Sequence, residues 1–370
     1  MIYNHLRAAA LALLVAATPA HAELRKFEMS IQEAELTVAP GFKTKVWAFN
    51  GQVPGPLLHV KEGDTVEVLV HNQTDQAHTV HWHGVYQTKS WDNDGVPNVT
   101  QKNILPGENQ TYRFVADKAG SLWYHCHTNV AEHLGLRGMF GPLIVDPKKP
   151  SKVEREVTKQ AVLMFSGWNK RVSQTLGEGM KPGEALEYFS INGKSMPLNQ
   201  PIRVKTGDVL RLRLYAATIP VAFHLHGHDL LVTHKDGAAL EHPYVADTIG
   251  MQPGERYDVI VHMNNPGLWA THDHIDHHTT NNGQEHGGSM LTVEYDGVER
   301  PSFYMWKNIA FQPDFYMSES LAKPYGIYNI EALRGVPATL SPASPSPANI
   351  RPAPEHEHDH NAPEGVTKQP

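Results

Sequence analysis

The chain contains two copies of one sequence pattern, and this repeat constrains the fold more than any other feature. Five short blocks return in the same order, and the offset between copies stays near 142 to 147 residues. The first copies begin at Phe49, His59, His81, Pro106 and Leu122, and their counterparts begin at Ile191, Arg203, His224, Pro253 and Leu268. Because chance similarity rarely preserves both order and spacing, the sequence predicts two homologous domains. A charged linker around residues 151–159 would join them.

Residues within the repeat indicate β-structure. Residues 45–147 are rich in valine, threonine and aromatic residues, with frequent Gly, Pro and Asn turns. Residues 66–70 (VEVLV) alternate as a half-buried strand does, and residues 141–145 (GPLIV) end like a strand. No segment shows a sustained helical period. We therefore expect an all-β fold, with a β-sandwich in each of two domains, residues 23–150 and 151–300.

The N-terminal end reads as a secretory signal peptide over residues 1–22. Arg7 supplies a positive start, residues 8–17 form an apolar stretch, and residues 20–22 (AHA) form a small-x-small cleavage pattern. Ten apolar residues are too few to cross a bilayer, and no later apolar run approaches that length. We expect a periplasmic or secreted protein without a membrane span.

The C-terminal end departs from the repeat. Residues 301–340 hold aromatic and methionine side chains, which predicts an extension packed on a domain or on a neighbouring subunit. Residues 341–370 are rich in proline, alanine, serine and histidine, which predicts a disordered tail. The formal net charge is −7, and −8 without the signal peptide, so the chain lacks the basic footprint of a nucleic-acid-binding protein.

Cysteine and histidine usage indicates a transition metal. Cys126 is the single cysteine, so an intramolecular disulfide is impossible, and a lone thiol in an exported chain needs burial or a bound metal. The chain also has 24 histidines. Soft sulfur combined with abundant imidazole favours a transition-metal site.

Four His-x-His pairs lie in the repeat, two in each copy. Side chains on a strand alternate between its two faces, so both imidazoles of a pair point to the same side. Two such strands per domain would present four imidazoles to one metal cluster, and eight buried imidazoles without partners would be costly. The pairs are His81/His83, His125/His127, His224/His226 and His272/His274.

Cys126 lies between His125 and His127, so alternation turns its sulfur to the opposite face of the strand. It can therefore hold a different metal from its neighbours, and it provides a short covalent route for an electron between the two sites. His78, His133 and Met139 would complete a blue-copper set of two histidines, one thiolate and a weak axial methionine.

The second domain serves as an internal control. The alignment of the repeats places Val221 opposite His78, Asp273 opposite Cys126 and Gly287 near the position of Met139. The paired histidines are retained while the blue-site ligands are not. The sequence therefore predicts one blue site per chain, in the first domain.

In these motifs the chain resembles the multicopper oxidases. The motifs are residues 78–84 (HTVHWHG), 123–127 (WYHCH) and 224–228 (HLHGH), and the resemblance covers about residues 40 to 297. It implies two tandem cupredoxin-like Greek-key β-sandwich domains followed by the C-terminal extension. The subgroup it is most similar to is that of two-domain laccases with type 1 copper only in the N-terminal domain.

The resemblance also implies ligands for four coppers per subunit. Type 1 copper would be held by His78, Cys126, His133 and Met139. A trinuclear cluster would be held by His81, His83, His125, His127, His224, His226, His272 and His274, with His81 and His224 as type 2 ligands and the other six on the type 3 pair. Asp94 resembles the acid that delivers protons to the cluster in this family, and an Asp-Gly turn is the alternative explanation for it.

The family further implies the reaction and its partners. A donor would lose one electron at a time at type 1 copper, and dioxygen would be reduced to water at the cluster. The donor is a small molecule, a metal ion or a redox protein. Relatives of this size are head-to-tail homotrimers with each cluster between subunits, which is a closed heterologous assembly.

Two features depart from the family pattern. His133 and Met139 follow Cys126 by seven and thirteen residues, a longer loop than in many three-domain laccases. Five further histidines match no ligand position: His228, His262, His277, His278 and His286.

Two alternatives stay open at this point. Copper-containing nitrite reductase also has two cupredoxin domains, but it has a single interfacial copper and no histidine directly after its cysteine. A copper storage or carrier protein could use the histidines of residues 355–360 (EHEHDH) for capture, but it would not need a cysteine bridge between two sites.

Overall fold

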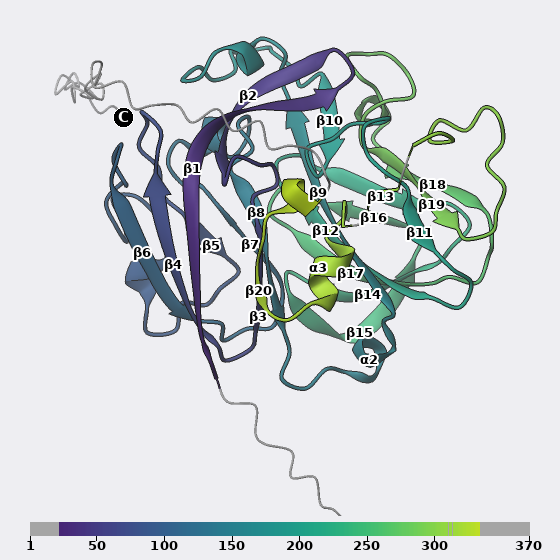
Figure 1. Ribbon diagram of the computed structural model, residues 1–370, viewed down its shortest axis with the longest axis horizontal. Helices are drawn as coiled ribbons and strands as arrows, with labels where there is room; N and C mark the ends of the chain where they lie inside the picture. Colours follow the sequence, from purple (N-terminus) through teal and green to yellow (C-terminus); the bar gives the residue numbers. More distant parts are fainter. Residues whose placement is uncertain (1–21, 310, 313, 334–370) are drawn as a thin grey trace, which may run out of the picture.

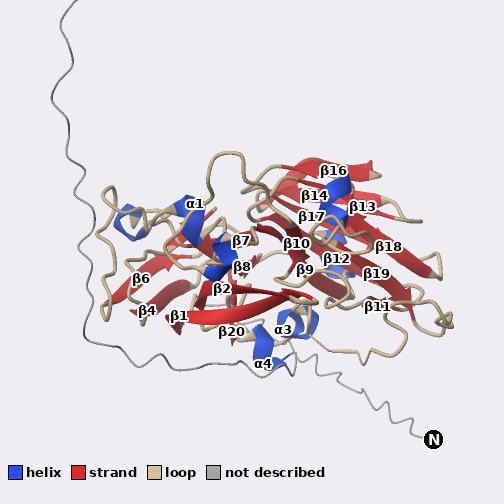
Figure 2. Ribbon diagram, turned by 90° about the horizontal axis from the view of Figure 1, so that it is seen from above, coloured by secondary structure: helices blue, strands red, loops and turns tan. Residues whose placement is uncertain are grey.

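The computed structural model describes residues 22–309, 311–312 and 314–333 (Figure 1). The predicted signal peptide lies outside these residues apart from Ala22, as do the tail at 341–370 and the last part of the extension. Strands dominate, and the helices are few and short (Figure 2). The predicted all-β class is therefore confirmed.

The first sandwich is built from two sheets. One has the order β2-β1-β4-β6 and the other has the order β20-β3-β8-β7-β5. Alternate residues of β4 are buried, because Val66, Val68 and Val70 face the core between the sheets. Its strands are β1 (Leu24–Ala39), β2 (Phe42–Phe49), β3 (Leu57–Lys61), β4 (Thr65–Asn72), β5 (His81–His83), β6 (Asn109–Val115), β7 (Gly120–His125), β8 (Phe140–Asp146) and β20 (Gly326–Tyr328).

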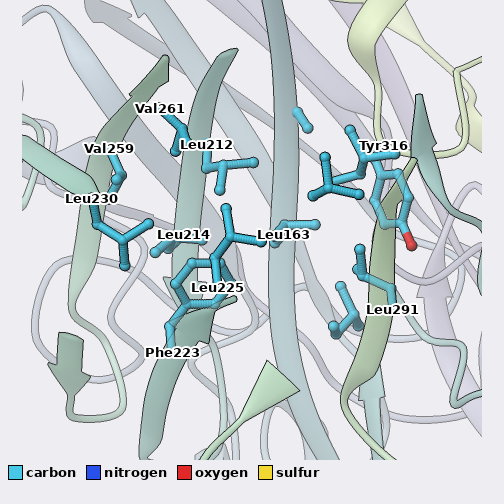
Figure 3. Close-up of a cluster of buried hydrophobic side chains, with 14 of the residues drawn as sticks. Leu163, Leu212, Leu214, Phe223, Leu225, Leu230, Val259, Val261, Leu291 and Tyr316 are labelled. Carbon is cyan, nitrogen blue, oxygen red and sulfur yellow. The ribbon is translucent and has the colours of Figure 1, made fainter. Parts of the chain in front are cut away.

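The second sandwich has sheets of order β10-β9-β12-β17-β14-β15 and β11-β19-β18-β13-β16. Leu212 and Leu214 of β12 and Val259 of β17 point into its core together with Phe223 of β13 (Figure 3). Its strands are β9 (Lys159–Trp168), β10 (Tyr188–Ile191), β11 (Ile202–Val204), β12 (Val209–Ala216), β13 (Val221–Leu225), β14 (Leu230–Lys235), β15 (Ala238–Ala246), β16 (Thr248–Met251), β17 (Arg256–His262), β18 (Leu268–Asp273) and β19 (Met290–Tyr295).

The helices are short; most lie in connections between strands, and α4 follows the last strand. No helix in the described part of the chain is long and apolar enough to cross a membrane. The α-helices are α1 (Val130–His133), α2 (Lys152–Glu156), α3 (Ser318–Ala322) and α4 (Ile330–Leu333), and the 3₁₀ turns are η1 (Trp91–Asn93), η2 (Val172–Gln174) and η3 (Asp276–Thr279).

The described residues after position 300 pack on both sandwiches. The Trp306 indole donates to the carbonyl of Asn199 at 2.8 Å, and the Tyr316 hydroxyl donates to that of Gln200 at 2.6 Å. Further along, β20 pairs with β3 and so extends a sheet of the first sandwich. The domain limits at positions 150 and 300 stay predictions. Strand β20 lies after both limits, yet it belongs to a sheet of the first sandwich.

A buried ionic network joins the two sandwiches. Ser121 of β7 donates to Asp258 of β17 at 2.5 Å, and Arg211 and Arg213 of β12 also bind this carboxylate. Burial opposes ionisation of Asp258, but the two guanidinium groups outweigh it and lower the pKa of this carboxyl far below its usual value. The contact therefore depends on an ionised Asp258.

We expect Asp258→Ala to destabilise the protein by about 3–5 kcal/mol, because it removes the nearest carboxylate from two buried guanidinium groups and leaves them only the more distant Glu154 and Asp146. The pKa of Asp258 is lower in the folded than in the unfolded protein, so its ionisation stabilises the fold above the unfolded-state pKa of about 3.9. This stabilisation is lost as the pH falls through the folded-state pKa. Chemical unfolding at neutral and acidic pH measures both effects. The exposed Asp75→Ala is the control, and equal midpoints for the two variants would contradict the expectation.

Candidate metal centre

Four histidines of the first domain converge on one face. Strands β5 and β7 are antiparallel with His81 opposite His125, and the ring centroids of these two lie 5.2 Å apart. His83 Nδ1 lies 3.4 Å from His125 Nε2, and the His127 ring lies 5.4 Å from that of His81. The nitrogens of His81, His83 and His125 lie within 4.8 Å of one another, close enough to share a metal cluster.

The second domain repeats this arrangement. Strands β13 and β18 place His224 opposite His272, with ring centroids 5.9 Å apart. His226 Nε2 lies 3.2 Å from His272 Nε2, and the His274 ring lies 5.8 Å from that of His224. Each domain therefore carries four imidazoles that lie together. We call the four in the first domain the first quartet (His81, His83, His125 and His127) and the four in the second domain the second quartet (His224, His226, His272 and His274).

Backbone carbonyls orient the imidazoles in the same way in both domains. His81 Nδ1 donates to the carbonyl of Asp94 at 2.7 Å, and His224 Nδ1 donates to that of Asp247 at 2.9 Å. These bonds leave the Nε2 lone pair free for a metal. Sequence reasoning missed Asp247, because it lies 23 residues after its histidine whereas Asp94 lies 13 after its own.

Burial favours the neutral, metal-binding form of His83 and His125 in the first quartet. Burial lowers the pKa of His125 well below its usual value. Burial and the nearby Arg256 guanidinium lower the pKa of His83 to about 3. Neutral imidazole is the form that coordinates metal ions, so these side chains are ready ligands at neutral pH.

The two quartets do not meet within one chain. Ring contacts join histidines inside each quartet, and over residues 22–309 none joins the first quartet to the second. The second quartet is also more open, because His226 and His274 are exposed whereas His125 is buried. The eight predicted cluster ligands therefore form two separate groups.

The predicted blue-site ligands form a separate group, which is buried and belongs to neither quartet. Cys126 Sγ lies 3.3 Å from His133 Nδ1 and 3.8 Å from His78 Nδ1, and the two nitrogens are 3.2 Å apart. His78 Nε2 bonds to Thr74 Oγ1 at 2.8 Å, which leaves Nδ1 directed at the sulfur. Met139 is fully buried in the same core, and its carbonyl accepts the Cys126 N–H at 3.0 Å.

The donor set and its electrostatics fit copper. Burial raises the pKa of the Cys126 thiol to about 11, and a bound metal ion would be needed to hold the thiolate at neutral pH. Burial lowers the pKa of His78 well below its usual value, and burial with Arg137 lowers that of His133 to about 4. One sulfur and two neutral imidazoles are a donor set preferred by copper.

The structure corrects the counterpart of Met139 in the second domain. The alignment pointed to Gly287, but the Asp273 N–H donates to the carbonyl of Ser289 at 3.1 Å, as that of Cys126 donates to Met139. Ser289 therefore occupies the backbone position in the second domain that Met139 occupies in the first. The error arose because the loops before this position differ in length between the two domains.

The five unassigned histidines lie outside the two compact groups of candidate ligands found in the described residues. His228 Nε2 bonds to the Tyr295 hydroxyl at 2.6 Å, and His278 Nδ1 bonds to Asp273 at 2.6 Å. His262, His277 and His286 are exposed.

Comparisons with known proteins agree with this geometry. Two sequence-family models, both described as multicopper oxidase, match residues 30–150 and 167–283. The solved structure of the multicopper oxidase mgLAC is 52% identical, covers 84% of this chain and 98% of its own, and has a TM-score of 0.83. The blue copper oxidase from Nitrosomonas europaea is 50% identical, with the same coverages and a TM-score of 0.82.

Curated relatives point the same way. Laccase-4 of Thanatephorus cucumeris is 34% identical over 68% of this chain and 51% of its own length, so the chain spans about half the length of the curated relatives it matches. A copper nitrite reductase from Nitrosomonas europaea is 20% identical with a TM-score of 0.62, which shows a shared fold alone. The chain belongs to the multicopper oxidase family.

Proposed function

We propose that the chain is a laccase-like oxidase that couples one-electron oxidation of a donor to four-electron reduction of dioxygen to water. The observation that carries this proposal is the position of Cys126. Its sulfur lies with the blue-site histidines, while the residues on either side of it, His125 and His127, belong to the first quartet. Type 1 copper would be held by His78, Cys126, His133 and Met139, and the trinuclear cluster by the two quartets.

Copper bound at these residues would supply one-electron redox chemistry and dioxygen binding. The chain itself supplies the route between the two sites. The carbonyl of Cys126 accepts the Nδ1–H of His125 at 2.9 Å, in addition to the covalent backbone link between them. The blue-site group is thus connected to the first quartet without an intervening gap.

We propose that three chains associate head to tail, so that one subunit's first quartet meets the second quartet of the next. The separation of the quartets within one chain and the exposure of His226 and His274 support this assembly. Tyr244 and Val245, 47% and 62% exposed, lie on β15 near Asp247 and provide apolar surface for such a contact. A closed ring would complete three identical clusters.

Asp94 is the proposed source of protons for dioxygen reduction. One of its carboxylate oxygens lies 3.4 Å from His81 Nδ1, and its side chain is 29% exposed. It therefore lies between the first quartet and solvent. Its backbone carbonyl, which orients His81, would be unaffected by a change of side chain.

Asp94→Asn is expected to slow dioxygen reduction roughly 100-fold or more, which is the usual scale for losing a general acid. The blue absorption should stay unchanged, because the substitution keeps the backbone bond to His81 and the blue-site group is separate. Oxygen uptake and visible spectra measure the two properties. Asp92→Asn, at an exposed aspartate two residues earlier, is the matched control, and wild-type turnover in the Asp94 variant would exclude the role.

Copper content separates the proposed oxidase from its rivals. An oxidase with one type 1 copper and a trinuclear cluster requires about four coppers per chain, whereas a nitrite reductase requires about two. The complete second quartet favours the former. A carrier protein would bind copper but consume no oxygen with any reductant.

The donor and the destination of the protein are also proposals. Oxygen uptake screened with phenols, cuprous ion, ferrous ion and a small redox protein would identify the donor class. Export to the periplasm or the medium follows from the predicted signal peptide. N-terminal sequencing of the mature protein should then begin at residue 23.

A further inference from the structure

The second domain keeps the backbone frame of the blue site, with Asp273 and Val221 in place of Cys126 and His78. In the first domain Met139 N–H donates to the carbonyl of His133 at 3.2 Å, and in the second Ser289 N–H donates to that of His278 at 2.8 Å. The Ser289 carbonyl also accepts the Asp273 N–H, as the Met139 carbonyl accepts that of Cys126. His278 is therefore the counterpart of His133. The sequence offset hides the match, because His278 follows Asp273 by five residues and His133 follows Cys126 by seven.

Asp273 occupies the place of the blue-site sulfur. Backbone hydrogen bonds of Thr79 and Thr128 favour the thiolate form of Cys126, and Cys126 Sγ lies 3.7 Å from the Thr128 carbonyl oxygen. The Asp273 carboxylate accepts the corresponding N–H groups, those of Ala222 at 2.9 Å and Ile275 at 3.1 Å. The two side chains are thus held by equivalent backbone groups, one in each domain.

The remaining carboxylate oxygen of Asp273 accepts the Nδ1–H of His278 at 2.6 Å. Asp273 is fully buried, and a buried carboxylate requires such partners. The His278 ring stacks on Phe189 with centroids 4.1 Å apart, which fixes its orientation. Val221 stands where His78 would supply a further ligand, so a direct hydrogen bond replaces the metal between the two side chains.

We propose that the Asp273–His278 pair positions His272 and His274 for the trinuclear cluster, in place of the copper that ties the equivalent strand in the first domain. Asp273 lies between the two histidines and points to the opposite face of β18, so its anchorage controls the direction in which they project. The pair acts through these ligands and is a positioning device. This inference rests on the proposed function, because it requires a cluster built on the second quartet.

Asp273→Ala and His278→Ala test the pair in the full-length, copper-loaded protein. Removing groups that orient metal ligands typically weakens binding about 10–100-fold, so at limiting copper we expect a matching loss of affinity for cluster copper. The near-ultraviolet absorption of the coupled type 3 pair should be lost, while the blue absorption of the first domain is retained. Copper titration and both absorption bands measure this without relying on turnover.

Two further variants sharpen the test. Asp273→Asn keeps the oxygen that accepts the Ala222 and Ile275 N–H groups and should restore most of the type 3 signal. His277→Ala is the matched control, because His277 is exposed and adjoins His278 without bonding to Asp273. Its copper content and spectrum should equal those of the wild type.

The outcomes are distinguishable from failure of the proposed function. Full cluster copper and a wild-type type 3 band in both alanine variants would overturn the positioning role. Equal loss of the blue and type 3 bands, without rescue by Asp273→Asn, would also overturn it, because that result indicates general unfolding. A wild-type protein with only two coppers per chain would instead refute the oxidase.

Discussion

Cys126→Ser is expected to abolish the blue absorption and reduce oxygen uptake to the rate measured without protein. The hydroxyl of serine is not ionised at neutral pH and is a poor copper ligand, so roughly one copper per chain should be lost. His125 and His127 flank Cys126 but project to the opposite side of the chain, and His81 and His83 lie on the neighbouring strand β5, so the first quartet should keep its coppers. Visible spectra, copper analysis and oxygen uptake measure the three effects.

Met139→Leu serves as the control for this prediction. It removes a weak axial ligand from the same buried core and should preserve the blue colour while changing the reduction potential. Unchanged oxygen uptake in the Cys126 variant would show that electrons reach the cluster by another route. It would remove the main support for the proposed function.

Mixed assemblies of two inactive chains are expected to recover about a quarter of wild-type activity. One chain carries His81→Ala and His83→Ala, and the other carries His224→Ala and His226→Ala. In a head-to-tail ring every mixed trimer contains one interface at which both quartets are intact. With random mixing about three quarters of trimers are mixed, and one cluster in three is then complete.

Each inactive chain expressed alone is the control, because every cluster in its trimers lacks one half. Two different affinity tags would isolate the mixed oligomers, in which the expected activity rises from about a quarter to about a third of wild type. No recovery in confirmed mixed trimers would mean that each cluster forms within one chain. That outcome would require a movement that brings the two quartets together, since they are apart in the chain described here.

The strand pattern was predictable because it is local. Period-two alternation placed His81 and His83 on one face, and it separated Cys126 from His125 before any contact was known. The all-β class and the multicopper oxidase family are confirmed. The assignments of individual ligands stay predictions, although the structure brings His78 and His133 together at the sulfur.

Loop positions were less predictable. The Gly287 assignment was wrong because strand ends are equivalent between the domains while the loops that join them are not. Asp247 was missed for the same reason. Its carbonyl reaches His224 through the pairing of β13 with β16, which no spacing in the sequence reports.

The sequence by itself determined two domains, the chemistry of their ligands and the faces from which these project, because all of these follow from residue type and short-range alternation. Only the tertiary structure decided that the two quartets stay apart and that the second is open. It also decided that Asp273 and His278 meet where the first domain has its sulfur and histidine. Such contacts depend on sheet pairing and loop paths between residues distant in the chain.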